Sequence, residues 1–291
     1  MKMKKRWFFA VMMAMVMTFT SMFTAPVLAA SNTSGGNNVQ KSTEKELTAA
    51  EQEAAAIEKY GYYKGPNAKG IPVLTYHYVV SDAQRRGAYS GTSLAVSRTT
   101  FENQMKWLHN RHYRTINCEE LYLWHEGKIR LPKKTVMITF DDGMRCLYDN
   151  AYPVLKKYHM KGTCFVVGYW SLKNRDALTP SRIRWMQKDY PDFEFQSHTY
   201  NMHTRQKAKW GYNNTLKDAE KQKKMFGFEY LAYPYGTFNM PMVRAYRASG
   251  IKMAFAYGDN NYALRSQNLY RIRRIKISGN DSSREFTRWF K

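Results

Sequence analysis

Cysteine is scarce in this sequence. Only Cys118, Cys146 and Cys164 occur among the 291 residues, and none lies in a Cys-x-x-Cys pattern. The count is too small for a disulfide framework, and the spacing does not favour a thiolate metal site. We expect the three side chains to pack in the interior without a disulfide. One pair is possible, and the odd count leaves at least one thiol unpaired within the chain.

Long apolar runs are also scarce. The run at residues 7–17 follows a basic start and precedes Val27-Leu28-Ala29, which is typical of a cleaved signal peptide at residues 1–29. Polar residues from Thr18 onward make this run short for a membrane-spanning helix, although an uncleaved anchor is the alternative. We therefore expect a secreted protein that is extracellular or associated with the cell surface.

Acidic residues are half as frequent as basic ones. The 23 Asp and Glu against 46 Lys and Arg give a net charge of +23, which favours binding to anionic wall or membrane-surface polymers. Nucleic acid is the competing partner, but the basic residues are scattered, so we do not expect it. The alternating cluster Arg271, Arg273, Arg274 and Lys276 is typical of a strand with one solvated face.

The chain divides by composition into three parts. After the signal peptide, residues 30–66 form a linker, with a flexible Ser, Gly and Asn-rich start and a helix expected at residues 44–60 that has no apolar face wide enough for a core. Residues 67–291 have the length of one α/β domain, and their alternating strand and helix patterns predict a parallel sheet closed as a barrel. The expected strands are 71–78, 136–140, 163–167, 193–197, 230–233, 253–257 and 270–277.

The stretch Val136–Gly143 carries the first chemical signal. An apolar strand runs into Phe140, and then Asp141, Asp142 and Gly143 follow. Neighbouring residues on a strand point to opposite sides, so both carboxylates can share one pocket only if the strand ends and the backbone turns there. Two carboxylates this close repel each other when both are ionised. We therefore expect them to have different roles, or a nearby cation that allows both to be ionised.

Histidines follow a later strand. His198 and His203 are five residues apart, an offset that places them on different faces of a continuous helix, so convergence on one ion requires a loop or turn. A third pattern, Tyr233-Pro-Tyr-Gly236, is typical of a tight turn.

These three patterns occur in the order that resembles the NodB-type polysaccharide deacetylases, carbohydrate esterase family 4. The resemblance covers roughly residues 70 to 291, and it implies a distorted (β/α)7 barrel. By this resemblance Asp142, His198 and His203 hold a divalent metal, with Zn²⁺ as the default and Co²⁺, Ni²⁺ or Fe²⁺ as alternatives.

The resemblance also implies roles around that metal. Asp141 is the general base, and the backbone N–H of Tyr235 holds the developing oxyanion. We expect Tyr233, Pro234 and Tyr200 to contact the substrate. Tyr76, Tyr169 and Trp170 are further aromatic candidates for stacking on sugar rings. The histidines outside the motifs are expected to be surface or packing residues: His109, His112, His125 and His159.

Two departures from the family pattern appear. Ala232 stands where many members carry an arginine that orients the base, and Arg273, Arg274 and Lys276 are candidates to replace it. No histidine follows Gly250, whereas His77 ends the first expected strand. This resembles the circularly permuted deacetylases of biofilm polysaccharide, and it implies that His77 is the general acid.

The resemblance therefore implies a hydrolase of carbon–nitrogen bonds, an N-deacetylase of poly-β-1,6-N-acetylglucosamine, which we expect to be monomeric. A peptidoglycan or chitooligosaccharide deacetylase is the alternative, and a non-catalytic wall-binding protein is a third reading. A two-carboxylate glycosidase fits less well, because adjacent acids at one strand end do not flank a sugar bond.

Overall fold

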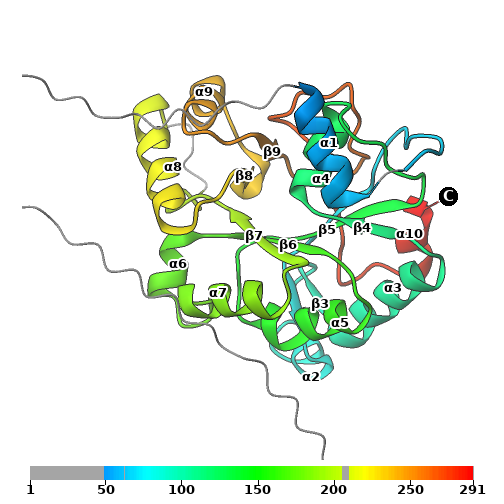
Figure 1. Cartoon of the computed structure of the whole chain (residues 1–291). Coiled ribbons are helices and arrows are strands. Elements are labelled where there is room, and N and C mark those ends of the chain that lie inside the picture. The colour runs from blue at the N-terminus through cyan, green and yellow to red at the C-terminus, as the bar shows by residue number, and fades with distance from the viewer. Residues whose placement is uncertain (1–48, 62, 205–209, 291) are drawn as a thin grey trace, which may run out of the picture. The chain divides into compact units, whose positions relative to one another are not determined.

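A parallel β-sheet that curls into a half-barrel organises the fold (Figure 1). The computed structural model describes residues 49–61, 63–204 and 210–290. Seven strands of the eight-stranded sheet follow the order β10-β1-β5-β6-β7-β8-β9. The eighth, β4, pairs with the first half of β5, whereas β6 pairs with the second half. A separate parallel pair joins β2 and β3. The strands are β1 (Val73–Tyr76), β2 (Tyr78–Val80), β3 (Ala95–Ser97), β4 (Arg114–Ile116), β5 (Thr135–Phe140), β6 (Gly162–Val166), β7 (Phe193–Ser197), β8 (Tyr230–Ala232), β9 (Met253–Phe255) and β10 (Ile275–Lys276).

Helices connect these strands as crossovers. Several begin at side-chain caps: Asn117 forms a capping box with Glu120 at the start of α4, and Ser97 accepts the Thr100 N–H at the start of α3. The helices are α1 (Ala49–Tyr60), α2 (Asp82–Arg86), α3 (Arg98–Asn110), α4 (Cys118–His125), η1 (Leu147–Ala151), α5 (Tyr152–Lys157), α6 (Gly168–Lys173), α7 (Pro180–Asp189), α8 (Tyr212–Phe226), η3 (Pro234–Gly236), α9 (Met240–Ala248), α10 (Ser283–Thr287) and η4 (Arg288–Phe290).

Alternate residues of the strands serve two different cores. On β5, Val136, Ile138 and Phe140 face the helices α3, α5 and α7, which cover one side of the sheet in Figure 1. Met137 faces the other way, into a cluster that the side chains of α4 complete. Because all six residues of β5 are buried, this strand is covered on both faces, as expected for the centre of a parallel sheet.

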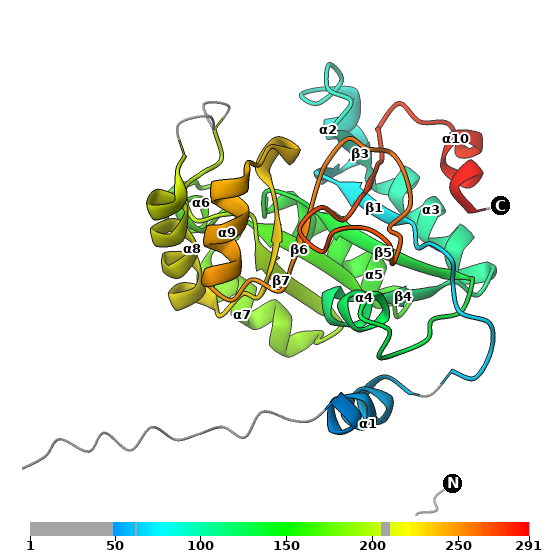
Figure 2. The same ribbon diagram turned by 90° about the horizontal axis from the view of Figure 1, so that it is seen from above.

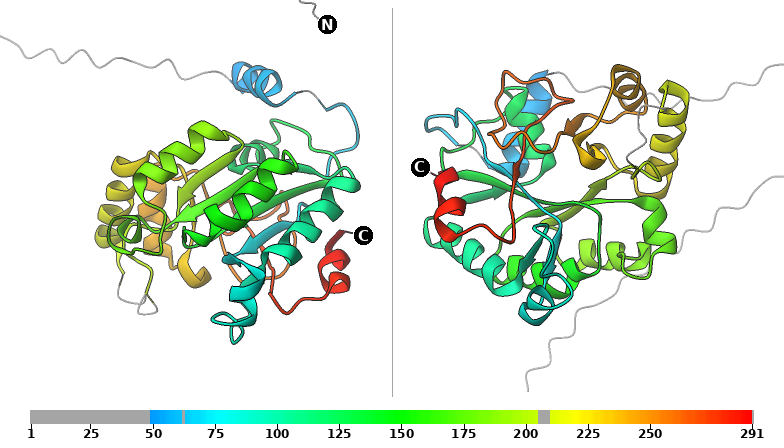
Figure 3. Two further views of the ribbon diagram at one scale, coloured as in Figure 1. Left: turned by 90° about the horizontal axis from the view of Figure 1, so that it is seen from below. Right: turned by 180° about the vertical axis from the view of Figure 1, so that it is seen from behind.

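The C-terminal helices close the outer layer. Figure 3 shows α10 beside α3, and the ring of Trp107 on α3 lies 6.1 Å from that of Phe286. Tyr113 donates a hydrogen bond from its hydroxyl to the carbonyl of Phe290 at 3.0 Å. The described part of the chain contains no helix that is long and apolar enough to span a membrane.

An irregular segment, residues 269–276, joins the two edges of the sheet. Its first half lies along β9, where the Ile272 N–H donates to the Ala254 carbonyl at 2.9 Å. Its second half becomes β10, which pairs with β1. Figure 2 shows this late part of the chain beside the early strand β1. The strand expected at residues 270–277 is therefore wrong for most of its length, since only Ile275–Lys276 is a strand.

Most expected elements agree with the structure in type and differ at their ends. The strand expected at 71–78 stops at Tyr76 and resumes at Tyr78, so His77 lies at a break. The short elements α2, β3, β4 and α6 were not expected. The helix expected at 44–60 begins at Ala49 in the described residues, and the expected signal peptide and most of the linker lie outside them. Cys118, Cys146 and Cys164 are free thiols, and Cys118 and Cys164 are buried as expected, whereas Cys146 is partly exposed.

Candidate active site

The carboxyl ends of β1, β5, β7 and β8 carry the candidate site. Phe140 is the last residue of β5, and the backbone then turns through Asp142 (φ 77°) and Gly143 (φ 74°). Glycine is favoured at position 143, because a Cβ there would lie 3.1 Å from the Val166 side chain in a backbone conformation that other residues rarely adopt. This turn keeps the neighbouring carboxylates Asp141 and Asp142 on one rim, and both are buried.

Asp141 is held by an arginine from the segment that joins the sheet edges. The Arg274 guanidinium donates one hydrogen bond to each carboxylate oxygen of Asp141, both at 2.8 Å, and another to the Ala256 carbonyl at 2.7 Å. Arg274 is fully buried and Asp141 is 3% exposed. Of the three basic residues considered for the missing arginine, Arg274 therefore makes the contact. The solvated face expected for its cluster is wrong at this residue.

Asp142 lies between two imidazoles. Its Oδ1 is 3.5 Å from His198 Nε2 and 3.1 Å from His203 Nε2. Ligand atoms at about 2.0–2.2 Å from a tetrahedral zinc lie about 3.3 Å apart, so these separations match a shared ion. Among the described residues, this is the only group of three or more His, Cys, Asp or Glu with ligand atoms within 4.8 Å of one another.

The second nitrogen of each imidazole has its own contact. His198 Nδ1 lies 2.8 Å from the Ala232 carbonyl, which selects the tautomer that leaves the Nε2 lone pair toward Asp142. His203 Nδ1 lies 3.3 Å from the Tyr235 hydroxyl. The donor set of one carboxylate oxygen and two oriented Nε2 atoms therefore fits a divalent cation with further positions open, which is typical of hydrolytic sites.

Aromatic rings flank His203. The rings of Trp170 and Tyr235 lie 4.5 Å and 4.8 Å from it, and Tyr235 is 45% exposed. Tyr235 belongs to the turn η3, where it has φ 55° and Gly236 has φ 69°. A Cβ at Gly236 would meet the backbone of Tyr257 at 2.7 Å, so only glycine allows this turn to pack so closely.

His77 lies next to Asp141 in the sheet register, because Tyr76 pairs with Phe140. It directly follows β1, and the Asp141 N–H donates to the carbonyl of the preceding residue, Tyr76, at 2.9 Å. Its Nδ1 is buried and has no hydrogen-bond partner among the described residues. The ring of Tyr257, two residues after β9, lies 5.3 Å from that of His77, and the two ring planes are inclined at 72°. Sequence reasoning missed Tyr257, because no motif marks a tyrosine after a short strand.

The buried charges shift the pKa values in this site. Burial alone would raise the pKa of Asp141, but the charge and hydrogen bonds of Arg274, together with the nearby imidazoles of His198 and His77, outweigh burial and hold that pKa well below the ordinary value. Burial would likewise raise the pKa of Asp142, but the His203 hydrogen bond and neighbouring imidazoles lower it. Burial lowers the pKa of His198 to about 4 despite both carboxylates. Both aspartates are therefore ionised at neutral pH, and His198 is a neutral donor.

Three residues expected to contact the substrate are buried. Tyr233 is fully buried, with its ring stacked 4.8 Å from Phe238, and Pro234 beside it is also buried. Tyr200 is 9% exposed. The ring of Tyr76 was another candidate, but it is fully buried and donates a hydrogen bond to Gln104. These side chains pack the walls of the barrel and expose little surface, and their expected contacts with a substrate stay a prediction.

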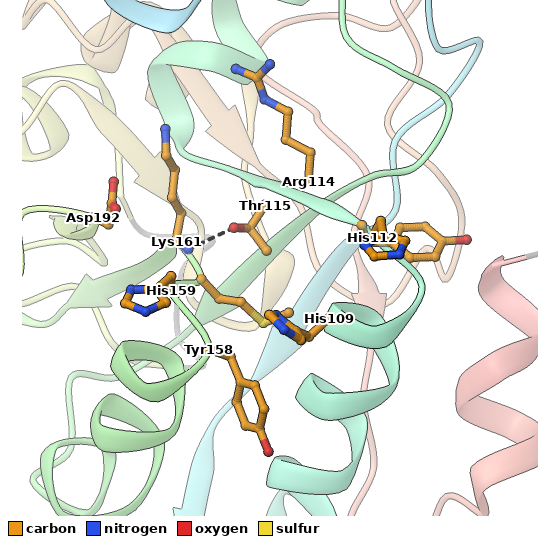
Figure 4. Close-up of a pocket in the computed structure, with 10 residues that line it drawn as sticks. His109, His112, Arg114, Thr115, Tyr158, His159, Lys161 and Asp192 are labelled. Carbon is orange, nitrogen blue, oxygen red and sulfur yellow. Dashed lines mark hydrogen bonds between the residues drawn. The ribbon is translucent and has the colours of Figure 1, made fainter.

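Another cleft contains three of the remaining histidines. It has a volume of about 490 Å³ and lies at the amino ends of β4, β6 and β7, away from the carboxylates. Figure 4 shows His109, His112 and His159 around it with their rings well separated, so they do not form a ligand set. His125 lies elsewhere, with Nε2 2.8 Å from the Gln267 carbonyl. The expectation of surface and packing roles therefore agrees with their positions.

Comparisons with known proteins identify the family of the chain. The family model of polysaccharide deacetylase matches residues 128–254. The chain is 31% identical over 211 residues to a poly-beta-1,6-N-acetyl-D-glucosamine N-deacetylase of Staphylococcus aureus. The aligned region covers 67% of this chain and 72% of the relative. The chain therefore belongs to the polysaccharide deacetylase family, whose members are hydrolases of carbon–nitrogen bonds.

Solved structures share the fold. The Streptococcus pyogenes deacetylase PplD in complex with acetate matches 76% of this chain and 98% of its own, with 24% identity and a TM-score of 0.67. BC0361, a polysaccharide deacetylase from Bacillus cereus, matches 76% of this chain and 69% of its own, with 27% identity and a TM-score of 0.64. The half-barrel is thus a deacetylase fold, in agreement with the expected NodB-type architecture.

Proposed function

We propose that this polysaccharide deacetylase is a metal-dependent enzyme that removes acetyl groups from poly-β-1,6-N-acetylglucosamine outside the cell. One observation carries the proposal: ligand atoms of Asp142, His198 and His203 lie within 4.8 Å of one another, beside the buried pair of Asp141 and Arg274. A divalent ion held there, Zn²⁺ by default and Co²⁺, Ni²⁺ or Fe²⁺ otherwise, would supply Lewis-acid activation of water and of the acetyl carbonyl.

The protein groups divide the proton transfers. Asp141 is ionised and fixed by Arg274, so it accepts the proton from the water that attacks the acetyl carbon. The Tyr235 backbone N–H, on the tight η3 turn, donates to the oxygen that gains negative charge. His77 gives a proton to the nitrogen as the carbon–nitrogen bond breaks. The products are acetate and a glucosamine residue with a free amine.

The proposed substrate rests on a relative and on exposed aromatic residues. The Staphylococcus aureus relative is named for poly-β-1,6-N-acetyl-D-glucosamine. Exposed Tyr235 and half-buried Trp170 flank His203, and Tyr169 next to Trp170 is 39% exposed. Rings placed in this way offer apolar faces to a sugar chain, and they are proposed as substrate contacts in addition to the more buried Tyr233 and Tyr200.

The setting of the enzyme is proposed from the sequence. Residues 1–29 would direct secretion, residues 30–66 would tether the catalytic domain, and residues 67–291 would act as a monomer. Among described residues of the tether, Lys59 forms an ion pair with Glu119 at 2.8 Å. The full chain has a net charge of +23, and loss of Lys2, Lys4, Lys5 and Arg6 with the signal peptide would leave about +19, which would favour anionic polymers of the cell surface as additional partners.

Acetate release from defined substrates tests the proposal. Purified protein with zinc would be compared on β-1,6-linked N-acetylglucosamine oligomers, β-1,4-linked chitooligosaccharides and peptidoglycan, with and without a chelator. We expect the highest kcat/KM on the β-1,6 oligomers, loss of activity with the chelator and recovery on adding metal. The Asp141→Asn variant is the control, because it should bind metal without turnover. A higher kcat/KM on peptidoglycan or chitooligosaccharide would contradict the proposed substrate. Full activity in the presence of the chelator would contradict the proposed metal dependence.

A further inference from the structure

The loop between the two imidazoles has a constrained backbone. His198 and His203 are five residues apart, and Thr199 between them has φ 72°, which is costly for a β-branched residue. The Thr199 hydroxyl accepts the Met202 N–H at 3.1 Å and so shortens the loop. A conformation of this kind persists only where the surroundings hold it.

A buried carboxylate on a different element holds the middle of this loop. Asp218, on α8, accepts the N–H of Tyr200 on one oxygen and the N–H of Asn201 on the other, each at 2.8 Å. The side chain is 8% exposed. Because both oxygens are engaged by consecutive peptide groups, the carboxylate fixes the orientation of the two peptide planes midway between the imidazoles.

The opposite side of the loop is also anchored, through its carbonyl groups. The Gly168 N–H donates to the Thr199 carbonyl at 3.1 Å, and the Tyr169 N–H donates to the Tyr200 carbonyl at 2.8 Å. One turn along α8 from Asp218, Gln222 donates to the Val166 carbonyl at 2.8 Å. The middle of the loop is thus held from two sides: the first residues of α6 bind the carbonyls of Thr199 and Tyr200, and Asp218 of α8 binds the N–H groups of Tyr200 and Asn201.

We propose that Asp218 is a positioning residue for the metal centre, which shapes the 198–203 loop so that both imidazoles converge with Asp142. The role rests on the metal site of the proposed function, although Asp218 contacts none of the proposed ligands. A carboxylate suits the task because it accepts at both oxygens, whereas an amide would place its NH₂ group against one of the two N–H groups. Burial raises the pKa of Asp218 to about 6, although the loop N–H groups lower it, so assays at pH 7.5 keep it ionised.

The test compares Asp218→Asn with Glu220→Gln, an exposed acid on the same helix that undergoes the same change in charge. Zinc affinity is measured by competition with a chromophoric chelator, and the cobalt form is examined by its visible spectrum. We expect the Kd for zinc to rise about tenfold to a hundredfold in Asp218→Asn, as for other residues that orient metal ligands, and to stay within twofold in Glu220→Gln. Acetate release by Asp218→Asn should recover substantially at saturating zinc, which a generally misfolded protein would not show.

If Asp218→Asn does not fold, backbone hydrogen exchange of the metal-free wild type tests whether Asp218 binds the loop. The N–H groups of Tyr200 and Asn201 should be protected without metal, because Asp218 binds them before the ion does. Rapid exchange of both, or an unchanged Kd and cobalt spectrum in a folded Asp218→Asn, would overturn the positioning role while leaving the proposed function intact. A wild type that binds no metal would overturn the metal centre and this role together.

Discussion

Replacing Arg274 should separate the effect of its charge from that of its geometry. The guanidinium is fully buried and donates two 2.8 Å hydrogen bonds to Asp141. A hydrogen bond to a charged group contributes about 1.5–3 kcal/mol, and a lysine ammonium can replace at most one of the two parallel hydrogen bonds to Asp141. Loss of one such bond, about 2 kcal/mol, predicts a fall in kcat/KM of about 30-fold for Arg274→Lys.

Arg274→Met removes the charge as well. It leaves Asp141 as an uncompensated buried carboxylate, which destabilises a fold by about 3–5 kcal/mol. The Arg274 charge lowers the pKa of Asp141, so its stabilisation is present above the unfolded-state pKa and is lost as pH falls through the folded pKa. In Arg274→Met the pKa of Asp141 should rise, and the acidic limb of the kcat/KM profile should move to higher pH.

Urea unfolding of four proteins measures the coupling: the wild type, Arg274→Met, Asp141→Asn and the double variant. We expect the double variant to be more stable than Arg274→Met alone, because a neutral asparagine needs no counter-charge. Additive changes in the free energy of unfolding, together with an unmoved acidic limb in Arg274→Met, would refute the reasoning.

Three further predictions concern the other residues of the site. His203→Ala should lose zinc, measured as metal per protein after dialysis, whereas stoichiometric zinc in the variant would exclude His203 as a ligand. His77→Gln should retain zinc and lower kcat by about 10²–10⁴-fold, the usual contribution of a general acid, and a kcat near that of the wild type would remove His77 from that role. Gly236→Ala should lower the midpoint of thermal unfolding, because the new Cβ would lie 2.7 Å from the Tyr257 backbone at a positive φ; an unchanged midpoint would show that the turn can adjust.

The sequence predicted the parts of the fold that periodicity and turn chemistry control. β7 begins and ends at the expected residues, Phe193 and Ser197, and β5 ends where Asp141 and Asp142 were expected to turn. His77 lies beside Asp141 because β1 pairs with β5, as expected if the acid-bearing strand has moved to the front of the chain. Each of these signals is local to a few residues.

Contacts between distant segments were not predictable in the same way. Arg274 and Asp141 are 133 residues apart, and an alternating basic pattern gives no sign that one member turns into the barrel. The three-residue strands β3 and β4 are defined by the strands they pair with, so no periodic run marks them. The motif places Tyr233 next to the metal in sequence, but it does not show that the ring packs against Phe238 in the core.

Anomalous X-ray diffraction from crystals of the zinc-loaded wild type tests the central claim most directly. The account predicts one strong peak about 2.0–2.2 Å from an Asp142 oxygen and from the Nε2 atoms of His198 and His203, with Asp141 still paired to Arg274. A peak at another group of residues, or none among these three side chains, would contradict it.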